Sequence, residues 1–150
     1  MARARGLPLA SHDDTTEAHV REAHGEGAVI SEFPTTRAAA REARRLGLAV
    51  LAGAPNLVRG ASHSGNVPAL ELARCGFLDI LSSDYVPASL LHGAFLLHRR
   101  AGWGIPEAVA AVTATPAALV GLTDRGEIAP GLRADLVRVR LADDLPVVRG

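Results

Sequence analysis

The chain alternates short apolar runs with longer alanine-rich or charged segments. Apolar runs of this length, bounded by glycine, proline or polar residues, are typical of strands buried in a sheet. They occupy residues 7–12, 27–34 and 48–55, with a shorter fourth run inside 77–87. Helix-forming segments occupy residues 13–27, 35–47, 69–76, 88–102 and 105–122. Four strand–helix units in series predict an α/β fold with parallel strands and helical crossovers.

Polar residues mark the starts of the first two predicted helices. Asp14, Thr15 and Thr16 are each able to cap the helix in 13–27. For Asp14 we favour an interaction with the positive end of the helix dipole. A threonine also begins the segment 35–47, and glycines end both helices.

The last part of the chain has a different pattern. Residues 124–150 contain the turn sequence Ala-Pro-Gly, and residues 135–141 alternate between apolar and polar side chains. Alternation of this kind predicts a half-exposed strand, outside the buried α/β layer.

Polar side chains follow each predicted strand at its carboxyl end. In parallel α/β folds the functional groups gather at these ends. The residues of interest are His12, Glu32, Asn56, Arg59, His63 and Asp84. Imidazole and carboxylate groups are ligands for divalent ions such as zinc or manganese, and a guanidinium group suits phosphate. A carboxylate such as Asp84 is also able to accept a proton from an activated water.

Each of these side chains also has a simpler interpretation. His12 is compatible with an ordinary hydrogen-bonded turn, Glu32 with a solvated carboxylate and Asp84 with a loop cap. The predicted loop 56–68 is compatible with a plain connection, although structureless loops of this length are uncommon in compact domains unless they are functional or disordered. Only their occurrence after four successive strands favours a site.

Composition excludes several classes of partner. The chain has 150 residues and a formal net charge of +0, with all 16 basic residues being arginine, so nothing favours binding to nucleic acid or an anionic membrane. Cys75 is the single cysteine, which precludes an internal disulfide. No segment approaches the run of about 20 apolar residues that spans a bilayer. We expect a cytoplasmic protein.

Four motifs in order resemble a known family. They are SHDD (11–14), ISEFPTT (30–36), AGAPNLVRGASHSGN (52–66) and DILSSDYVPASLL (79–91). They are similar to the diphosphatases of the carbon–phosphorus lyase pathway, which belong to the amidohydrolase superfamily. The tail sequence GEIAPGLRADLVRVRL resembles the closing β segment of that superfamily.

The resemblance implies a fold and a reaction. The fold is the C-terminal half of a (β/α)8 barrel in residues 1–122, followed by a segment of a small β-sandwich in 123–150. The reaction is metal-dependent hydrolysis of α-D-ribose 1-methylphosphonate 5-triphosphate, which releases diphosphate and leaves the 5-phosphate.

The resemblance also implies roles for individual residues. His12 corresponds to a metal ligand, and Asp84 to a metal ligand that also accepts a proton. Glu32 corresponds to a residue that binds either metal or substrate. Arg59 and His63 correspond to substrate phosphate contacts, to which Asn56 adds a further polar group.

The chain differs from the family in one large respect. A complete barrel takes about 250 residues, and the His-x-His pair of the superfamily does not occur in this sequence. We therefore expect a half-barrel that pairs with an N-terminal half or forms a homo-oligomer. Two other functions stay open: a related hydrolase that cleaves a C–N bond, and an inactive half-barrel.

Overall fold

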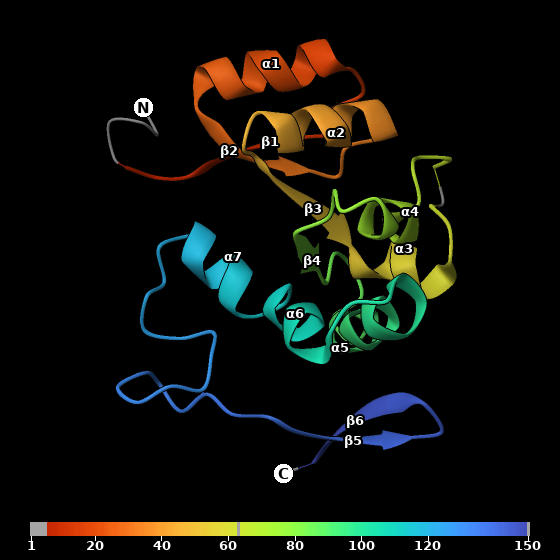
Figure 1. Cartoon of the computed structure of the whole chain (residues 1–150), viewed down its shortest axis with the longest axis vertical. Coiled ribbons are helices and arrows are strands. Elements are labelled where there is room, and N and C mark those ends of the chain that lie inside the picture. The colour runs from red at the N-terminus through yellow and green to blue at the C-terminus, as the bar shows by residue number, and fades with distance from the viewer. Residues whose placement is uncertain (1–5, 63, 150) are drawn as a thin grey trace.

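A four-stranded parallel sheet forms the centre of the fold. The computed structural model describes residues 6–62 and 64–149. The strands are β1 (Leu9–His12), β2 (Ala28–Glu32), β3 (Ala49–Gly53) and β4 (Ile80–Ser82), paired in the order β1-β2-β3-β4. Figure 1 shows the helices that connect successive strands. The predicted succession of four strand–helix units is confirmed.

Short helices make up most of the remaining chain. They are α1 (Glu17–Glu26), α2 (Arg37–Arg45), α3 (Ala54–Arg59), α4 (Ala69–Arg74), α5 (Ser89–Leu96), α6 (Ile105–Ala110) and α7 (Ala114–Leu119), with a π-helical turn, η2 (Leu97–Ala101), continuing α5. No helix in the described part of the chain is long and apolar enough to span a bilayer.

The ends of the first two helices follow the sequence signals. Thr16 caps α1 by accepting a hydrogen bond from the His19 backbone N–H at 3.2 Å, and Thr36 caps α2 by accepting one from Ala39 at 3.1 Å. Gly27 ends α1 at a φ of 95°, a left-handed conformation that glycine adopts without a steric cost.

The predicted loop 56–68 is partly wrong, because its first residues belong to helix α3. Pro55 lies in the first turn of α3, where its missing N–H costs nothing. Leu57 is 2% exposed and fixes the helix against the core. The connection to α4 is therefore shorter than predicted, and two predicted site residues lie on a helix.

The two faces of the sheet are packed differently. The outer face, which carries Val50 and Leu81, joins the main core beneath the connecting helices. The inner face carries a smaller cluster of Ile30, Ala49 and Ile80, against which Leu119 of α7 packs. The inner face is thus covered near the strand starts, whereas its carboxyl end carries polar residues.

A β-bulge lies at the start of β2. Leu9 pairs with Ala28, but Ala10 pairs with Ile30, so Val29 has no partner in the register. Val29 is 40% exposed. An extra residue in one strand shifts the side-chain alternation by one, and this shift places Ile30 on the inner face.

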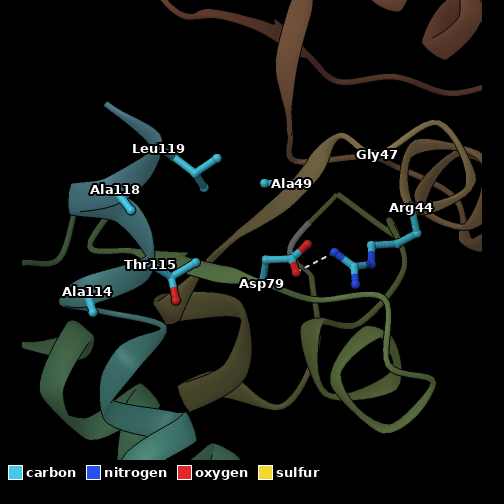
Figure 2. A pocket seen from close by; sticks show the side chains of 8 residues that line it. All are labelled: Arg44, Gly47, Ala49, Asp79, Ala114, Thr115, Ala118 and Leu119. Atoms are coloured by element: carbon cyan, nitrogen blue, oxygen red, sulfur yellow. Dashed lines mark hydrogen bonds and ion pairs between the residues drawn. The ribbon is translucent and has the colours of Figure 1, made fainter. Parts of the chain in front are cut away.

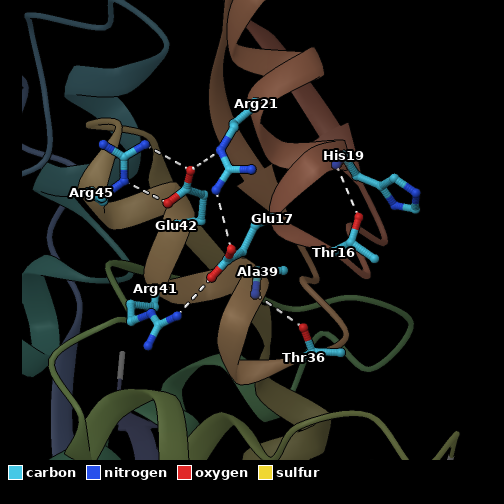
Figure 3. A network of polar contacts seen from close by, with 9 residues as sticks. All are labelled: Thr16, Glu17, His19, Arg21, Thr36, Ala39, Arg41, Glu42 and Arg45. Atoms are coloured by element: carbon cyan, nitrogen blue, oxygen red, sulfur yellow. Dashed lines mark hydrogen bonds and ion pairs between the residues drawn. The ribbon is translucent and has the colours of Figure 1, made fainter.

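A network of ion pairs joins α1 to α2 (Figure 3). Glu42 of α2 is 4% exposed and accepts hydrogen bonds from Arg45 and Arg21. Glu17 of α1 pairs with Arg21 and Arg41. The hydrogen bonds from Arg45, reinforced by Arg21, lower the pKa of Glu42 to about 2 although burial opposes this shift.

The C-terminal segment forms a separate antiparallel hairpin. Its strands are β5 (Arg138–Ala142) and β6 (Leu145–Arg149), and Val139 pairs with Val148. Exposed and half-buried residues alternate at the start of β5, as the sequence predicted. The division into segments 1–122 and 123–150 stays a prediction.

Candidate functional site

His12 and Glu32 lie side by side at the carboxyl end of the sheet. They are partners in the parallel register of β1 and β2, so their side chains leave the same face about 4.8 Å apart at the backbone. Glu32 lies two residues after Ile30, so its side chain is on the inner face with that of Ile30. Its register partner His12 is on the same face. The sequence prediction that these strand ends converge is met for this pair.

The His12 ring contacts the two residues that follow β1 and β2. Its Nδ1 lies 3.1 Å from Oδ2 of Asp13, and its ring meets that of Phe33 edge to face, with centroids 5.3 Å apart. Asp13 and Phe33 both have left-handed backbone conformations, with φ of 57° and 54°. Such conformations are costly for residues with side chains and cluster at functional sites.

Asp84 lies in the loop that follows β4, at the same end of the sheet as Phe33. It too has a left-handed backbone, with φ of 49°. Its Oδ2 lies 3.1 Å from the position that a Cβ on Gly53 would take, and Phe33 Cε1 lies 3.7 Å from that position. The lack of a side chain at residue 53 therefore lets the Asp84 carboxylate approach the end of β3, whereas the Phe33 ring would be in ordinary van der Waals contact with a Cβ there.

Ser82 adds a hydroxyl to this surface. It pairs with Gly53 in the register, and it lies two residues after Ile80, on the inner face. Its Oγ is buried and has no hydrogen-bond partner among the residues that the structure describes. A buried hydroxyl left unpaired costs about 1–3 kcal/mol, so this atom is suited to a group that the described residues do not supply.

The predicted substrate contacts differ in their surroundings. Arg59 is exposed and donates a hydrogen bond from Nη1 to the Tyr85 hydroxyl at 3.3 Å, which links α3 to the loop after β4. Asn56 accepts a hydrogen bond from the Ala69 backbone N–H at 3.0 Å, so its side-chain oxygen holds the start of α4. His63 lies outside the described residues.

The predicted metal ligands do not converge within the described part of the chain. No group of three or more His, Cys, Asp or Glu side chains lies there in a position to hold a metal ion. β1 and β4 are the two edges of the sheet, with β2 and β3 between them. Three strand spacings separate His12 from Asp84, or roughly 14 Å at the backbone. The described residues alone therefore do not fit a complete metal site.

Asp14 does not have the environment that its sequence position suggested. Its carboxylate Oδ2 accepts hydrogen bonds at 2.6 Å from the hydroxyls of Ser11 and Ser31, and the residue is 4% exposed. The side chain is therefore turned toward the strands rather than left at the helix start. The sequence offered no signal for this, because the two serines lie on different strands.

The roles of Gly53 and Phe33 were also missed at the sequence level. Both lie in the quoted motifs, near the ends of the apolar runs 27–34 and 48–55, where glycine and phenylalanine are ordinary residues. Only the register of β3 beside β4 reveals that a side chain at residue 53 would meet Asp84.

A hollow lies at the opposite end of the sheet (Figure 2). It has a volume of about 530 Å³. It is lined by Arg44, Gly47, Ala49, Asp79, Ala114, Thr115, Ala118 and Leu119. Its charged groups already stabilise the fold, since Arg44 pairs with Asp79 and Asp79 accepts a hydrogen bond from the Val50 N–H at 2.8 Å. Its chemistry is therefore separate from that of the strand ends.

Comparison with known proteins supports the motifs. Alpha-D-ribose 1-methylphosphonate 5-triphosphate diphosphatase of Escherichia coli (strain K12) is 56% identical over 146 residues, or 96% of this chain. Dihydroorotase of Methanopyrus kandleri is 35% identical over an alignment of 103 residues, and the match covers 57% of this chain. The chain spans 39% of the length of the first relative and 24% of the second.

The fold has a counterpart among solved structures. N-isopropylammelide isopropylaminohydrolase from Burkholderia multivorans aligns with a TM-score of 0.57 at 20% identity, covering 92% of this chain and 42% of that one. The family model described as "Amidohydrolase family" matches residues 2–147. The chain forms part of a (β/α)8 barrel, as indicated by its parallel sheet with crossover helices, the structural alignment and the family match. The chain therefore belongs to the amidohydrolase family.

Proposed function

We propose that the chain supplies the C-terminal half of a hydrolase that releases diphosphate from α-D-ribose 1-methylphosphonate 5-triphosphate. The observation that carries this proposal is the 56% identity to the E. coli diphosphatase along 96% of the chain. The reaction leaves the 5-phosphate of the ribose phosphonate. Its substrate is a polyanion, which agrees with the exposed Arg59 beside the strand ends.

Asp84 is proposed as the proton acceptor. The oxygen of a water molecule attacks a phosphorus atom of the triphosphate, the bridging P–O bond breaks, and diphosphate departs. The proton of the attacking water passes to the Asp84 carboxylate. Gly53 leaves room for this carboxylate at the end of β3.

Arg59 is proposed to bind the triphosphate. Its Nη1 is engaged by Tyr85, but a guanidinium group has five N–H donors, so others stay available for phosphate oxygens. Asn56 fixes the start of α4 through its oxygen and retains its NH2 group as a donor. His63 is proposed as a further phosphate contact on the basis of the family motif.

A divalent ion, zinc or manganese, is proposed to bind only when a second half of the barrel is present. His12 and Asp84 would contribute to its ligand set, with Glu32 as a further candidate. These three side chains do not form a metal site among the described residues. We propose that residues outside this chain supply the remaining ligands.

The test is reconstitution of a complete barrel. The chain is co-expressed with the N-terminal segment of the E. coli relative, and bound metal and diphosphate release are measured on the purified pair and on each part alone. We expect bound metal and diphosphate release only in the purified pair, and neither in the separate parts. His12→Ala should abolish both, whereas His19→Ala, on the exposed face of α1, should not. Failure of an assembled, metal-loaded pair to hydrolyse the triphosphate would contradict the substrate assignment.

A second candidate is hydrolysis of a C–N bond. It is favoured by the 35% identity to a dihydroorotase and by 38% identity over 84 residues to an adenine deaminase of Gluconobacter oxydans. These relatives cover 57% and 53% of the chain, less than the diphosphatase does. Cleavage of a cyclic amide, but not of the triphosphate, by the reconstituted pair would select this candidate. An assembled pair without either activity would indicate an inactive half-barrel.

A further inference from the structure

We infer that Asp14 is a positioning residue that holds the His12 and Glu32 strand ends in register from behind the sheet. The two serines that it binds immediately precede these site residues in the sequence: Ser11 precedes His12 and Ser31 precedes Glu32. Ser11 and Ser31 are themselves register partners in β1 and β2. Their side chains leave the face opposite to that of the site pair, because successive residues of a strand alternate.

The contacts of Asp14 are short and protected from water. Both serine hydroxyls donate to the same atom, Oδ2, at 2.6 Å. Ser31 is 0% exposed and Asp14 is 4% exposed. Hydrogen bonds to a carboxylate are stronger than those between neutral groups, and a buried carboxylate is costly unless it is well paired. This environment therefore favours one arrangement of the two strand ends.

The backbone of Asp14 extends the same connection to the loops. Its carbonyl oxygen accepts a hydrogen bond from the Thr35 N–H at 2.8 Å, and Thr35 O accepts one from Val67 N–H at 2.9 Å. The turns after β1 and β2 and the segment before α4 are thus joined through Asp14 and Thr35. Asp13, between His12 and Asp14, has a left-handed backbone that departs from strand geometry. The Asp14 side chain lies on the face of Ser11 and Ser31, opposite to that of His12.

This role rests on the proposed use of His12 and Glu32 as site residues, but it has a readout that needs neither metal nor substrate. The rings of His12 and Phe33 are in edge-to-face contact at 5.3 Å. The contact predicts a nuclear Overhauser effect between their ring protons in the unmodified chain. His12→Ala assigns the histidine signals.

The central variant is Asp14→Ala, with Asp79→Ala as the matched control. Asp79 also links neighbouring elements, because it accepts a hydrogen bond from the Val50 N–H and pairs with Arg44. These contacts lie at the opposite end of the sheet. Both variants are expected to lower the melting temperature. Only Asp14→Ala is expected to lose the His12–Phe33 cross-peak. Of the two aspartates, only Asp14 binds the serines that precede His12 and Glu32.

Ser31→Ala covers the case in which Asp14→Ala does not fold. It removes one of the two hydroxyl donors and is expected to weaken the cross-peak. A folded Asp14→Ala or Ser31→Ala chain with an unchanged cross-peak would overturn the positioning role. Equal loss of the cross-peak in Asp79→Ala would also overturn it, because the effect would then follow from lower stability alone. Neither result bears on triphosphate hydrolysis, which the reconstitution experiment tests separately.

Discussion

The Oδ2 atom of Asp84 lies 3.1 Å from the place where a Cβ on Gly53 would stand. Gly53 has a φ of −75°, which any residue adopts, so its backbone conformation does not require glycine. Glycine is favoured at this position because a Cβ would crowd the Asp84 carboxylate. Gly53 ends β3 directly beside Ser82 in the register, and its hydrogen atom leaves room for the carboxylate that we propose as the proton acceptor.

Replacing Gly53 by alanine should therefore affect activity more than stability. The new methyl group meets the tip of a flexible, exposed side chain, so the free energy of unfolding should fall by less than about 1 kcal/mol. Displacement of the Asp84 carboxylate should lower kcat/KM of the reconstituted pair by about tenfold or more. The measurements are thermal unfolding of the chain and diphosphate release by the pair.

Gly93→Ala provides the matched control. A Cβ at Gly93 would lie 3.0 Å from Ala54 Cβ and 3.1 Å from Leu81 Cδ1, inside the core. Overpacking there should cost about 1–3 kcal/mol without moving Asp84. Equal losses of activity in the two variants, measured well below their melting temperatures, would argue against a special role for the space at Gly53.

Glu42 should make the stability of the α1–α2 pair sensitive to acid. Its pKa in the folded chain is about 2, against an ordinary value of 4.5, because Arg45 and Arg21 favour its charged form. The carboxylate therefore stabilises the fold above pH 4.5, and this contribution is lost as the pH falls toward about 2. Urea unfolding of the unmodified chain and of Glu42→Gln between pH 7 and pH 2 should show two curves that converge at low pH.

Glu22→Gln, at an exposed position of α1, is the control for this titration. It should leave the dependence of stability on pH close to that of the unmodified chain. A stability difference between Glu42→Gln and the unmodified chain that stays constant down to pH 2 would contradict the assignment of the acid-sensitive stability to Glu42.

The two helix caps should differ in their contributions. Thr16→Ala removes one side-chain acceptor at the start of α1 and should cost about 1 kcal/mol. Thr36→Ala should cost more, because the Thr36 hydroxyl both caps α2 and donates to the Thr15 carbonyl at 2.9 Å. Chemical unfolding of both variants checks the order, and a smaller loss for Thr36→Ala would show that the second hydrogen bond contributes nothing.

The chain alone should associate with itself. Among the described residues, β1 pairs with β2 and leaves its other edge open. Leu141, Leu145 and Val148 of the hairpin are each at least half exposed. Open strand edges and exposed apolar groups favour association, so sedimentation coefficients should rise with concentration. Addition of the N-terminal segment of the E. coli relative should yield a one-to-one pair, and a chain that stays monomeric throughout would contradict this prediction.

The sequence predicted what depends on local chemistry. The caps at Thr16 and Thr36 and the helix end at Gly27 follow from the preferences of single residues for particular backbone conformations. The apolar runs predicted all four parallel strands for the same reason. Helix α3 was missed altogether, because residues 56–59 were assigned to a loop, and the burial of Leu57 that fixes the helix is a tertiary contact.

The membership of the candidate site stays a prediction, and its geometry could not be predicted from the sequence. The strand-end positions identified His12, Glu32 and Asp84, yet only the pairing of β1 with β2 shows which two are neighbours. The environment of Asp14 depends on serines from two strands. The bulge at Val29 determines which residues of β2 after it lie on the inner face of the sheet. These relationships arise from tertiary pairing, which no local pattern encodes.

The strand order has a consequence for how such barrels can be divided. Each of β2, β3 and β4 pairs with the strand that precedes it in the chain. Each strand–helix unit is therefore added beside the last without threading through existing structure. A cut between two units of this sheet interrupts a single strand pairing, and division of a closed barrel interrupts two. In both cases the internal pairings of each part stay intact. Gene fission, fusion or duplication can therefore act on whole units, and a barrel of this kind can be assembled from separately encoded parts that meet along two strand edges.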